Sequence, residues 1–272
     1  FPIYWIFYPH IHRLIKYSIK PQTLIYDIID FYPGYNKGKK YFLSSSNVIA
    51  AISQELKKNY LKYFPPANIN LVPQGFKLIK SKSLVHPKIK KIDNLQNKVG
   101  FIGAINNRLD FNLLFELISA TPDINYIFIG PTDTDSNTSS KPIDTLISKL
   151  FSFKNVYHIG LISKEQIRQF IDILDITMIP YDTKDDFNRL CYPMKLFEYF
   201  AAGKPVISTA IEELKKFPNL VFVSNSAKEW VKIINKIISK PWPKNLQIQE
   251  KILAKKNSWE NKIDQILKLL SK

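Results

Sequence analysis

Cysteine is nearly absent from this sequence, which has one, Cys191, among 272 residues. A single cysteine excludes a disulfide framework and fits a reducing compartment. Apolar runs are also short: none approaches the ~20 residues that span a bilayer, and the opening FPIYWIFYP lacks the cationic start of a signal peptide. Because methionine is missing from the first position, we expect a processed chain or a piece of a longer protein.

Acidic residues are few relative to basic ones, and the net charge is +16. Such a charge is typical of proteins that bind nucleic acid, anionic lipid or phosphorylated substrates, although solvated lysines in a lysine-rich chain produce the same total. The lysines are scattered, and no dense run of arginine with interleaved aromatic residues is found, which disfavours nucleic acid as a partner. A weak attraction to an anionic membrane surface remains open.

Short apolar runs alternate with longer amphipathic ones, and hydrophobic residues make up 45% of the chain, enough for a sizeable core. The alternation is typical of parallel sheets covered by helices on both faces, so we predict an α/β fold with doubly wound sheets. The expected strands are 23–29, 47–52, 69–73, 98–103, 124–130, 155–160, 175–180, 204–209 and 219–223. The expected helices lie near 53–63, 110–120, 143–151, 163–173, 193–202 and 226–239.

A basic segment without a clear apolar period, 76–97, is predicted to be a linker. Six expected strands follow it, enough for a complete doubly wound domain, whereas only about three precede it. We therefore predict an incomplete first domain at 1–85 and a second domain at 86–256. The tail, 257–272, is predicted to hold an amphipathic helix that packs back on the first domain, with one apolar side formed by Trp259, Ile263, Ile266, Leu267 and Leu270.

Glycine is scarce, with eight residues, and three of them end expected strands: Gly103, Gly130 and Gly160. In a parallel α/β sheet the ligand crevice lies beyond the carboxyl ends of the strands. Glycine at that edge permits a sharp turn or the close approach of a ligand. Turn geometry alone explains any one of these residues, but three at the same edge favour a binding crevice.

The segment CYPMKLFEYFAAGKP, 191–205, predicts a helix that begins near Pro193 and ends at Gly203. Lys195 and Glu198 lie three residues apart and therefore on one face of this helix. The Lys-then-Glu order opposes the helix dipole, so pairing between them is a weak reason for their presence. A surface Lys–Glu pair on an amphipathic helix nevertheless remains an alternative to a ligand site.

An anionic ligand at the amino end of this helix would explain both charges. The ammonium of Lys195 would form a phosphate site with the free N–H groups of the first turn, which belong to Met194, Lys195 and Leu196. Glu198, one turn deeper, would accept hydrogen bonds from two adjacent hydroxyls such as those of a ribose. A nucleoside diphosphate presents both groups at about that separation, so we predict a donor site lined by Pro193, Met194 and Leu196.

The segment YPMKLFEYFAAGKPVIST resembles the signature of GT-B glycosyltransferases in the large retaining group-1 family, which includes many bacterial sugar transferases. Other segments resemble the same family in the same order, among them IYDIIDFYPGY, NLVPQGF and VGFIGAINNRLDFNLL. The resemblance covers nearly the whole chain, but the amino-terminal strands of the family, with their Gly-rich loop, are absent. It implies a GT-B-like fold of two Rossmann-like domains, of which the first is incomplete.

In this resemblance, Glu198 matches the second glutamate of a paired-glutamate motif and would hold the ribose. The first glutamate falls at Leu190, which is not acidic. The usual contact with the hydroxyls of the donor sugar would then require a neighbouring side chain, and the candidates are Asp185, Asp186 and Asn188.

The resemblance also implies roles at the sheet edge. Arg108, just after Gly103, is the nearest match to the basic residues that bind the diphosphate, and Lys195 would supply a second cation. Tyr157 and Gly160 match the segment that lies against the nucleobase.

Asp27 and Asp30 resemble an acidic pair of the family that faces the cleft between the domains, with capping as the other interpretation. His10 and His12 are expected at the surface, with the cleft as their alternative location. Cys191 borders the predicted site, where we interpret it as a small buried apolar residue.

The implied reaction is transfer of a hexose-like sugar from a nucleoside-diphosphate donor to a glycan or lipid-linked acceptor in cell-surface polysaccharide synthesis. Fixed N–H dipoles and the two cations would stabilise the charge that develops on the diphosphate, so no metal or other cofactor is expected. We expect a cytoplasmic protein with a peripheral contact at the inner face of the cell membrane. Two alternatives remain open: a nucleotide-sugar-binding remnant without activity, and a GT-B-shaped nucleotide-sugar epimerase.

Overall fold

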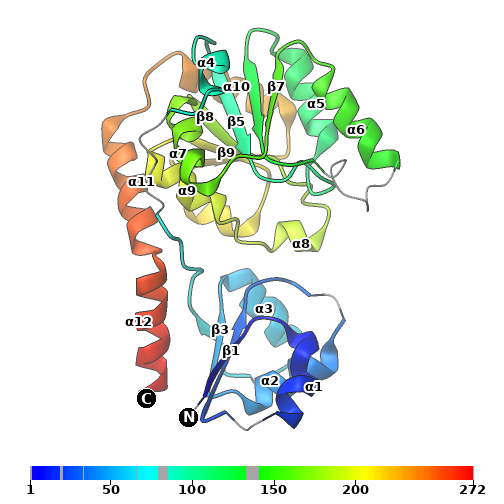
Figure 1. Cartoon of the computed structure of the whole chain (residues 1–272), viewed down its shortest axis with the longest axis vertical. Helices are drawn as coiled ribbons and strands as arrows, with labels where there is room; N and C mark the ends of the chain where they lie inside the picture. Colours follow the sequence, from blue (N-terminus) through cyan, green and yellow to red (C-terminus); the bar gives the residue numbers. More distant parts are fainter. Residues whose placement is uncertain are drawn as a thin grey trace.

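Two parallel sheets, one below the other in Figure 1, organise the chain. The computed structural model describes residues 2–18, 21–32, 34–65, 67–78, 85–132 and 141–271. The smaller sheet has the order β1-β2-β3-β4 and the larger one β10-β9-β8-β5-β6-β7. Every strand pair in both sheets is parallel, which confirms the predicted fold class.

The smaller sheet contains a strand that the sequence pattern did not predict, β1, which pairs with β2 at the sheet edge. Its strands are β1 (Ile3–Ile6), β2 (Thr23–Ile28), β3 (Val48–Ala51) and β4 (Asn70–Leu71), and its helices are η1 (Pro9–Ile11), α1 (His12–Tyr17), α2 (Asn36–Ser45) and α3 (Gln54–Tyr63). Of these helices, only α3 was expected. The Ser53 side chain caps α3 by accepting a hydrogen bond from the Leu56 N–H.

The larger sheet follows the predicted order of strands and helices. Its strands are β5 (Lys98–Ile102), β6 (Asn125–Ile129), β7 (Val156–Gly160), β8 (Ile176–Ile179), β9 (Val206–Ser208) and β10 (Val221–Val223). Around it lie α5 (Phe111–Ala120), α6 (Lys141–Phe151), α7 (Lys164–Ile173), α8 (Asp186–Arg189), α9 (Lys195–Ala202), η3 (Glu212–Lys216) and α10 (Ala227–Ile238). All residues of β5 and β8 are buried, as expected for strands covered on both faces.

The predicted linker, 76–97, is partly structured. It contains α4 (Ile89–Ile92), whose two isoleucines are buried against the core of the larger sheet. Residues 79–84 of the predicted linker lie outside the described residues. The division into domains at residues 85 and 256 stays a prediction.

Two helices end the chain, α11 (Lys244–Lys256) and α12 (Trp259–Leu270), and they run down one side of the molecule from the larger sheet to the smaller one (Figure 1). Ile266 of α12 is 1% exposed and joins a core with Ile25, Val48 and other residues on one face of the smaller sheet. The helices α2 and α3 contact strands of the same sheet and contribute Phe42 and Leu56 to a second core.

The predicted apolar side of α12 is wrong in part. Ile263 is 42% exposed and Leu267 55% exposed, whereas Lys262 is 1% exposed. The helix is rotated so that Lys262 reaches the buried carboxylate of Asp27, a partner that the hydrophobic pattern of the tail does not reveal. Within the described ranges, no helix has both the length and the apolar composition needed to cross a membrane.

Candidate functional site

Two cations meet around one tyrosine ring at the carboxyl ends of β5 and β8. The guanidinium carbon of Arg108 lies 4.3 Å from the ring centre of Tyr181. The Nζ of Lys195 lies 4.8 Å from the same ring and 4.0 Å from that of Phe101. Aromatic faces attract cations electrostatically, so they hold these groups in place without neutralising them. The structure thus brings together the two positive side chains that the sequence singled out.

The ammonium of Lys195 is buried, although the residue as a whole keeps some exposed surface. The pKa of Lys195 is lowered to about 7, chiefly by burial and also by the nearby charge of Arg108, against the opposing effects of Glu198 and Cys191. Gly103 makes room for this group, because a Cβ there would stand 2.6 Å from the Nζ. An anion bound beside Lys195 would favour its charged form and raise this pKa.

Asn188 holds Arg108 in position. Its Oδ1 accepts a hydrogen bond from Nε of Arg108 at 2.8 Å, and its amide nitrogen donates to the backbone oxygens of Arg108 and Asp182 at 3.3 and 3.0 Å. The ring of Phe187 lies 4.8 Å from the guanidinium carbon. Asn188 is only 2% exposed, so the guanidinium is held by a buried amide and by an aromatic ring.

The proposed substitutes for the missing first glutamate are all engaged elsewhere. Leu190 is buried at 4% exposure, and Asn188 is bonded to Arg108. Asp185 caps α8 by accepting a hydrogen bond from the Phe187 N–H at 2.9 Å. Asp186 forms an ion pair of 2.6 Å with Arg189. None of the three candidate side chains is therefore left without a protein partner.

The helix of the signature segment begins two residues later than expected. α9 starts at Lys195, with Met194 at the N-cap and Gly203 in the left-handed conformation at the carboxyl end. The Leu196 N–H donates to the oxygen of the buried Pro193 at 3.1 Å, so this amide is not free. This hydrogen bond closes a tight i→i+3 turn that begins at Pro193 and precedes the regular helix. In the described part of the chain, the N–H groups of Met194 and Lys195 make no backbone hydrogen bond.

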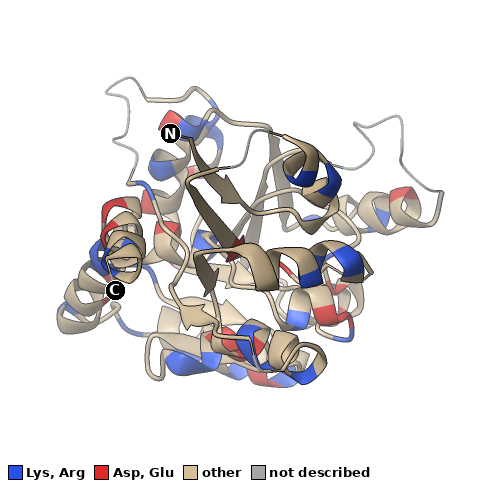
Figure 2. Ribbon diagram, turned by 90° about the horizontal axis from the view of Figure 1, so that it is seen from below, with Lys and Arg blue, Asp and Glu red and all other residues tan. Residues whose placement is uncertain are grey.

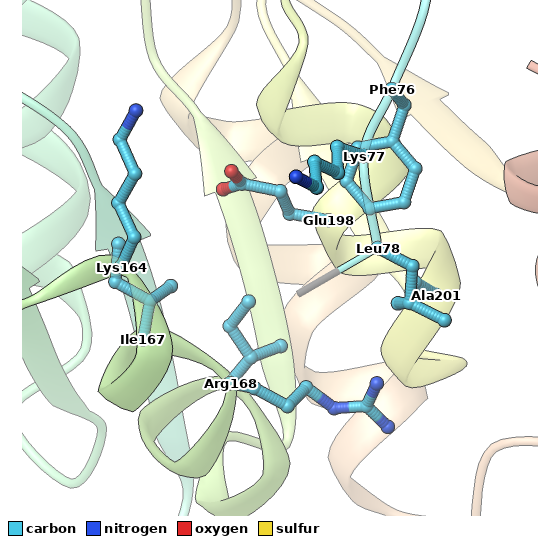
Figure 3. Close-up of a pocket in the computed structure, with 9 residues that line it drawn as sticks. Phe76, Lys77, Leu78, Lys164, Ile167, Arg168, Glu198 and Ala201 are labelled. Atoms are coloured by element: carbon cyan, nitrogen blue, oxygen red, sulfur yellow. The ribbon is translucent and has the colours of Figure 1, made fainter. Parts of the chain in front are cut away.

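Glu198 projects from α9 into a pocket formed with α7 and the segment that follows β4. Figure 3 shows its carboxylate between the ammonium of Lys77 and the side chain of Lys164, with Lys164 and Arg168 on the α7 side. Burial raises the pKa of Glu198, while Lys195 and Lys164 lower it. Within the described ranges, its carboxylate forms no ion pair or side-chain hydrogen bond. Its oxygens can therefore accept hydrogen bonds from a ligand.

The three strand-ending glycines share one edge of the sheet. The Gly103 N–H donates to the Ile129 oxygen, and the Gly130 N–H donates to the Gly160 oxygen, both at 2.9 Å. A Cβ on Gly130, whose φ is +142°, would overlap the carbonyl oxygen of Gly103. Close packing of adjacent loops thus requires Gly130, whereas Gly103 borders the cation pair.

Tyr157 and Gly160 lie apart from the pocket of Figure 3. Tyr157 is half-buried within β7, opposite Ile127 in the register. Gly160 lies beside Lys88, whose ammonium donates to the carbonyl oxygen of Ile159. The structure does not bring these two residues into contact with the charged side chains of α9, so their contact with a nucleobase stays a prediction.

One acidic residue of the smaller lobe, Asp30, lies close enough to Arg108 to interact with its charge. Asp30 follows β2, and while burial raises its pKa, the charge of Arg108 lowers it, which places the two within electrostatic reach. Asp27 instead lies in the interior, 0% exposed, and pairs with Lys262 at 2.8 Å. The expectation that Asp27 faces the cleft is therefore wrong, because its strand position turns it toward α12.

Sequence reasoning missed the residues that hold the cations. Tyr181 is the first residue after the expected strand 175–180, so its position at the edge of the sheet could be predicted from the sequence. Its contact with Arg108 could not. The sequence suggests Asn188 only as a ligand of the donor sugar, not as the hydrogen-bond partner of Arg108. Within the described ranges, no three His, Cys, Asp or Glu side chains lie close enough to hold a metal ion.

The chain has two lobes, each built on a parallel sheet. Arg108 and Lys195 lie at the strand ends of the larger sheet, and Glu198 lies on α9 together with Lys195. This is the architecture of a GT-B glycosyltransferase. Sucrose-phosphate synthase from Thermosynechococcus elongatus superposes with a TM-score of 0.77 at 15% identity, over 96% of this chain and 70% of that one. Anabaena HepE, solved with UDP and glucose, superposes with a TM-score of 0.70 at 16% identity, over 92% and 72%. These likenesses establish the fold.

The chain belongs to the family of glycosyl transferases group 1, whose sequence profile matches residues 84–256. TuaH of Bacillus subtilis, assigned as a glycosyltransferase of teichuronic acid biosynthesis, is 31% identical over 118 residues. That match covers 43% of this chain and 28% of TuaH, so the chain spans little more than a quarter of this relative. Membership of the family confirms the resemblance seen in the signature segment.

Proposed function

We propose that this protein transfers a sugar from a nucleoside-diphosphate donor to a glycan or lipid-linked acceptor of the cell surface. The observation that carries the proposal is that α9 presents a cation and a carboxylate at two neighbouring places. Lys195 sits beside Arg108 at the strand ends, and Glu198 opens into the adjoining pocket. A diphosphate joined to a ribose presents negative charge and hydroxyls at neighbouring positions, which match these two groups.

The leaving diphosphate would be bound where the positive charge is concentrated. Arg108, Lys195 and the unbonded N–H groups at the start of α9 would stabilise the negative charge that develops as the anomeric bond breaks. Because the chain supplies these cations, the proposed reaction requires no metal or other cofactor. Asn188 acts as a positioning residue that orients Arg108.

The relatives support the class of ligand. HepE was solved with UDP and glucose, and the name of TuaH refers to a polysaccharide of the cell surface. We extend both to this chain as a proposal: a nucleoside-diphosphate sugar as donor and a cell-surface glycan as acceptor.

A nucleotide-sugar-binding protein without transfer activity is the second candidate. The observation that favours it is the engagement of Asp185, Asp186 and Asn188, which leaves the usual acidic contact to the donor sugar unreplaced. Incubation with UDP-, GDP- and dTDP-sugars and acceptor glycans separates the two candidates. Sugar transfer supports the first, whereas nucleotide binding without transfer or hydrolysis supports the second.

Titration calorimetry with UDP, GDP and dTDP tests the donor site itself. We expect UDP, the nucleotide in the HepE structure, to bind with an affinity that depends on Lys195 and Glu198, and GDP and dTDP are tested beside it. If none binds, or if variants at both positions bind as the unmodified protein does, the donor site is wrong and both candidate functions fail with it.

We also propose a cytoplasmic location with a weak contact to the inner face of the membrane. Figure 2, which views the smaller sheet from below, shows Lys and Arg spread over many helices, an arrangement that supports a diffuse attraction. Sedimentation with phosphatidylglycerol vesicles should show binding at low salt. This binding should be lost at about 0.5 M salt, because that ionic strength screens contacts between exposed charges. Equal binding to neutral phosphatidylcholine vesicles would contradict this.

A further inference from the structure

Four aromatic rings form a continuous row on the smaller sheet. The ring centre of Tyr8 lies 5.8 Å from that of Tyr32 and 5.5 Å from that of His10. The next ring, Tyr35, lies 5.7 Å from His10. We call this row, made of Tyr32, Tyr8, His10 and Tyr35, the aromatic ledge.

The Tyr32 end of the ledge is the end that lies toward the larger sheet, because Asp30 interacts with both Tyr32 and Arg108. Its residues follow β1 and β2, at the carboxyl edge of the smaller sheet, where parallel α/β sheets bind ligands. Asp30 interacts electrostatically with Tyr32 on its own side and with Arg108 of the other sheet. The row therefore leads away from the place where the proposed donor diphosphate lies.

Surrounding contacts keep the ledge in place while leaving its outer rings accessible. The ammonium of Lys39 donates to the backbone oxygen of Tyr32. Gly38 lets α2 approach η1, because a Cβ there would overlap the carbonyl oxygen of Pro9. Tyr8 is 47% and Tyr35 55% exposed. Such exposure of large rings on an ordered surface is typical of a binding site.

The neighbourhood of the ledge is positively charged. Residues 2–26 and 31–54 contain no aspartate or glutamate. The helices beside the ledge instead carry four exposed cations: Arg13, Lys16, Lys37 and Lys40. Apart from Asp30 at the Tyr32 end, the ledge thus offers aromatic faces beside cations, which complement a ligand that has both apolar sugar faces and negative charges.

We propose that the aromatic ledge is the acceptor subsite and that its ligand is an acidic glycan. Pyranose rings stack on the tyrosine faces, the tyrosine hydroxyls and His10 contact the sugar hydroxyls, and the cations of α1 and α2 bind the carboxylates. The terminal sugar lies at Tyr32 and Asp30, next to the donor. As an acceptor site the ledge rests on the proposed function, but its binding of an acidic glycan is measurable without any donor.

Calorimetry with a hyaluronan tetrasaccharide, which bears uronates, and with neutral chitotetraose tests the ledge. We expect binding of the first and at least roughly threefold weaker binding of the second, since exposed charge pairs contribute modestly. Tyr8→Ala and Tyr35→Ala should each weaken the hyaluronan fragment about three- to tenfold, in line with the contribution of an aromatic contact. Tyr8→Phe should keep most of the affinity.

The matched control is Tyr63→Ala, at a tyrosine of α3 that is 62% exposed and outside the ledge; it should bind as the unmodified protein does. UDP affinity, measured on each variant, reports the donor site separately. Absence of hyaluronan binding, or equal losses in Tyr8→Ala and Tyr63→Ala, would overturn the ledge while leaving a measured UDP site intact. Equal affinity for chitotetraose would overturn the acidic character of the ligand.

Discussion

Lys262 of the last helix and Asp27 of the second strand form a buried ion pair, with 2.8 Å between Nζ and Oδ2. Trp5 donates a hydrogen bond of 3.1 Å to the same oxygen, and Lys262 also donates to Oε1 of Gln74 at 3.0 Å. Burial raises the pKa of Asp27 and lowers that of Lys262, and each charge partly offsets the effect on the other. The pair fixes the end of the chain to the smaller sheet.

Breaking this pair from one side should be costly. Lys262→Met leaves the carboxylate of Asp27 buried without a counter-ion, and we expect the free energy of unfolding to fall by about 3–5 kcal/mol. Urea denaturation followed by tryptophan fluorescence measures the change. The double variant Asp27→Asn with Lys262→Met should recover much of the loss, because no charge then remains buried. A single variant as stable as the unmodified protein would contradict the role of the pair.

Gly103 and Gly130 should tolerate alanine to different extents. Both have a positive φ, +145° and +142°. In Gly103→Ala the new Cβ meets the movable ammonium of Lys195, so we expect weaker UDP binding and about 1–2 kcal/mol less stability. In Gly130→Ala the Cβ meets the fixed carbonyl of Gly103, so the loss of stability should be larger. Gly34→Ala, with φ +81° and no neighbour within 4 Å, is the control for backbone strain alone.

The pKa of Lys195 predicts how UDP binding depends on pH. The value of about 7 in the folded protein lies below the ordinary 10.5, so the ammonium is charged below pH 7 and loses its proton above it. Affinity for UDP should therefore fall by roughly tenfold between pH 6.5 and 8.5, because an uncharged lysine must first gain a proton. Lys195→Met retains only the titration of UDP itself and serves as the reference. Identical pH profiles for both proteins would exclude a titrating Lys195.

The larger sheet could be predicted from the sequence, and the smaller one only in part. Strands such as β8 are buried along their whole length, so they stand out as continuous apolar runs. By contrast, α2 has the sequence NKGKKYFLSS, with a glycine and three lysines, and no side chain caps its amino end. Its contact with η1 helps to hold it in place. A tertiary contact of this kind produces no periodic pattern of apolar residues in the sequence.

The candidate site shows the same limit. Lys195 and Glu198 were recognised because helical spacing relates them directly. The contacts of Tyr181 and Asn188 with Arg108 join residues roughly seventy or more positions apart, and no local pattern encodes them. The buried face of α12 was predicted wrongly in part because it was derived from apolar residues alone, whereas Lys262 is buried by its pairing with Asp27.

Glu198→Ala should weaken nucleotide binding without unfolding the protein. Its carboxylate points into the pocket of Figure 3 and makes no ion pair with the described side chains. If it binds the two ribose hydroxyls, its loss should cost about 1–3 kcal/mol of UDP affinity in calorimetry. Glu229→Ala, at a half-exposed position of α10, is the control and should change nothing. Well below pH 7, where Lys195 keeps its charge, binding of 2′,3′-dideoxy-UDP should be far less sensitive to Glu198→Ala than binding of UDP, since the analogue lacks the hydroxyls.

Glu250 predicts a dependence of stability on pH. It is 0% exposed in α11, and both of its carboxyl oxygens lie 3.2 Å from the Trp242 Nε1 that donates to them. Burial raises its pKa to about 8, against the opposing effects of Trp242 and Lys251. Between its ordinary pKa of 4.5 and this value, the folded protein holds a proton that the unfolded chain releases. The contribution of Glu250 to stability is therefore largest at low pH and declines as the pH rises to about 8.

Urea denaturation at pH 5.5 and 8.5 measures this decline, which should reach about 1–3 kcal/mol for the unmodified protein relative to Glu250→Gln. The glutamine keeps an acceptor for Trp242 but cannot ionise, so its stability should vary less between the two pH values. Glu229→Gln, at an exposed glutamate, should keep the pH dependence of the unmodified protein. If Glu250→Gln follows the same pH profile as Glu229→Gln, the buried carboxyl is not the group that loses its proton, and another residue must account for any loss of stability above neutral pH.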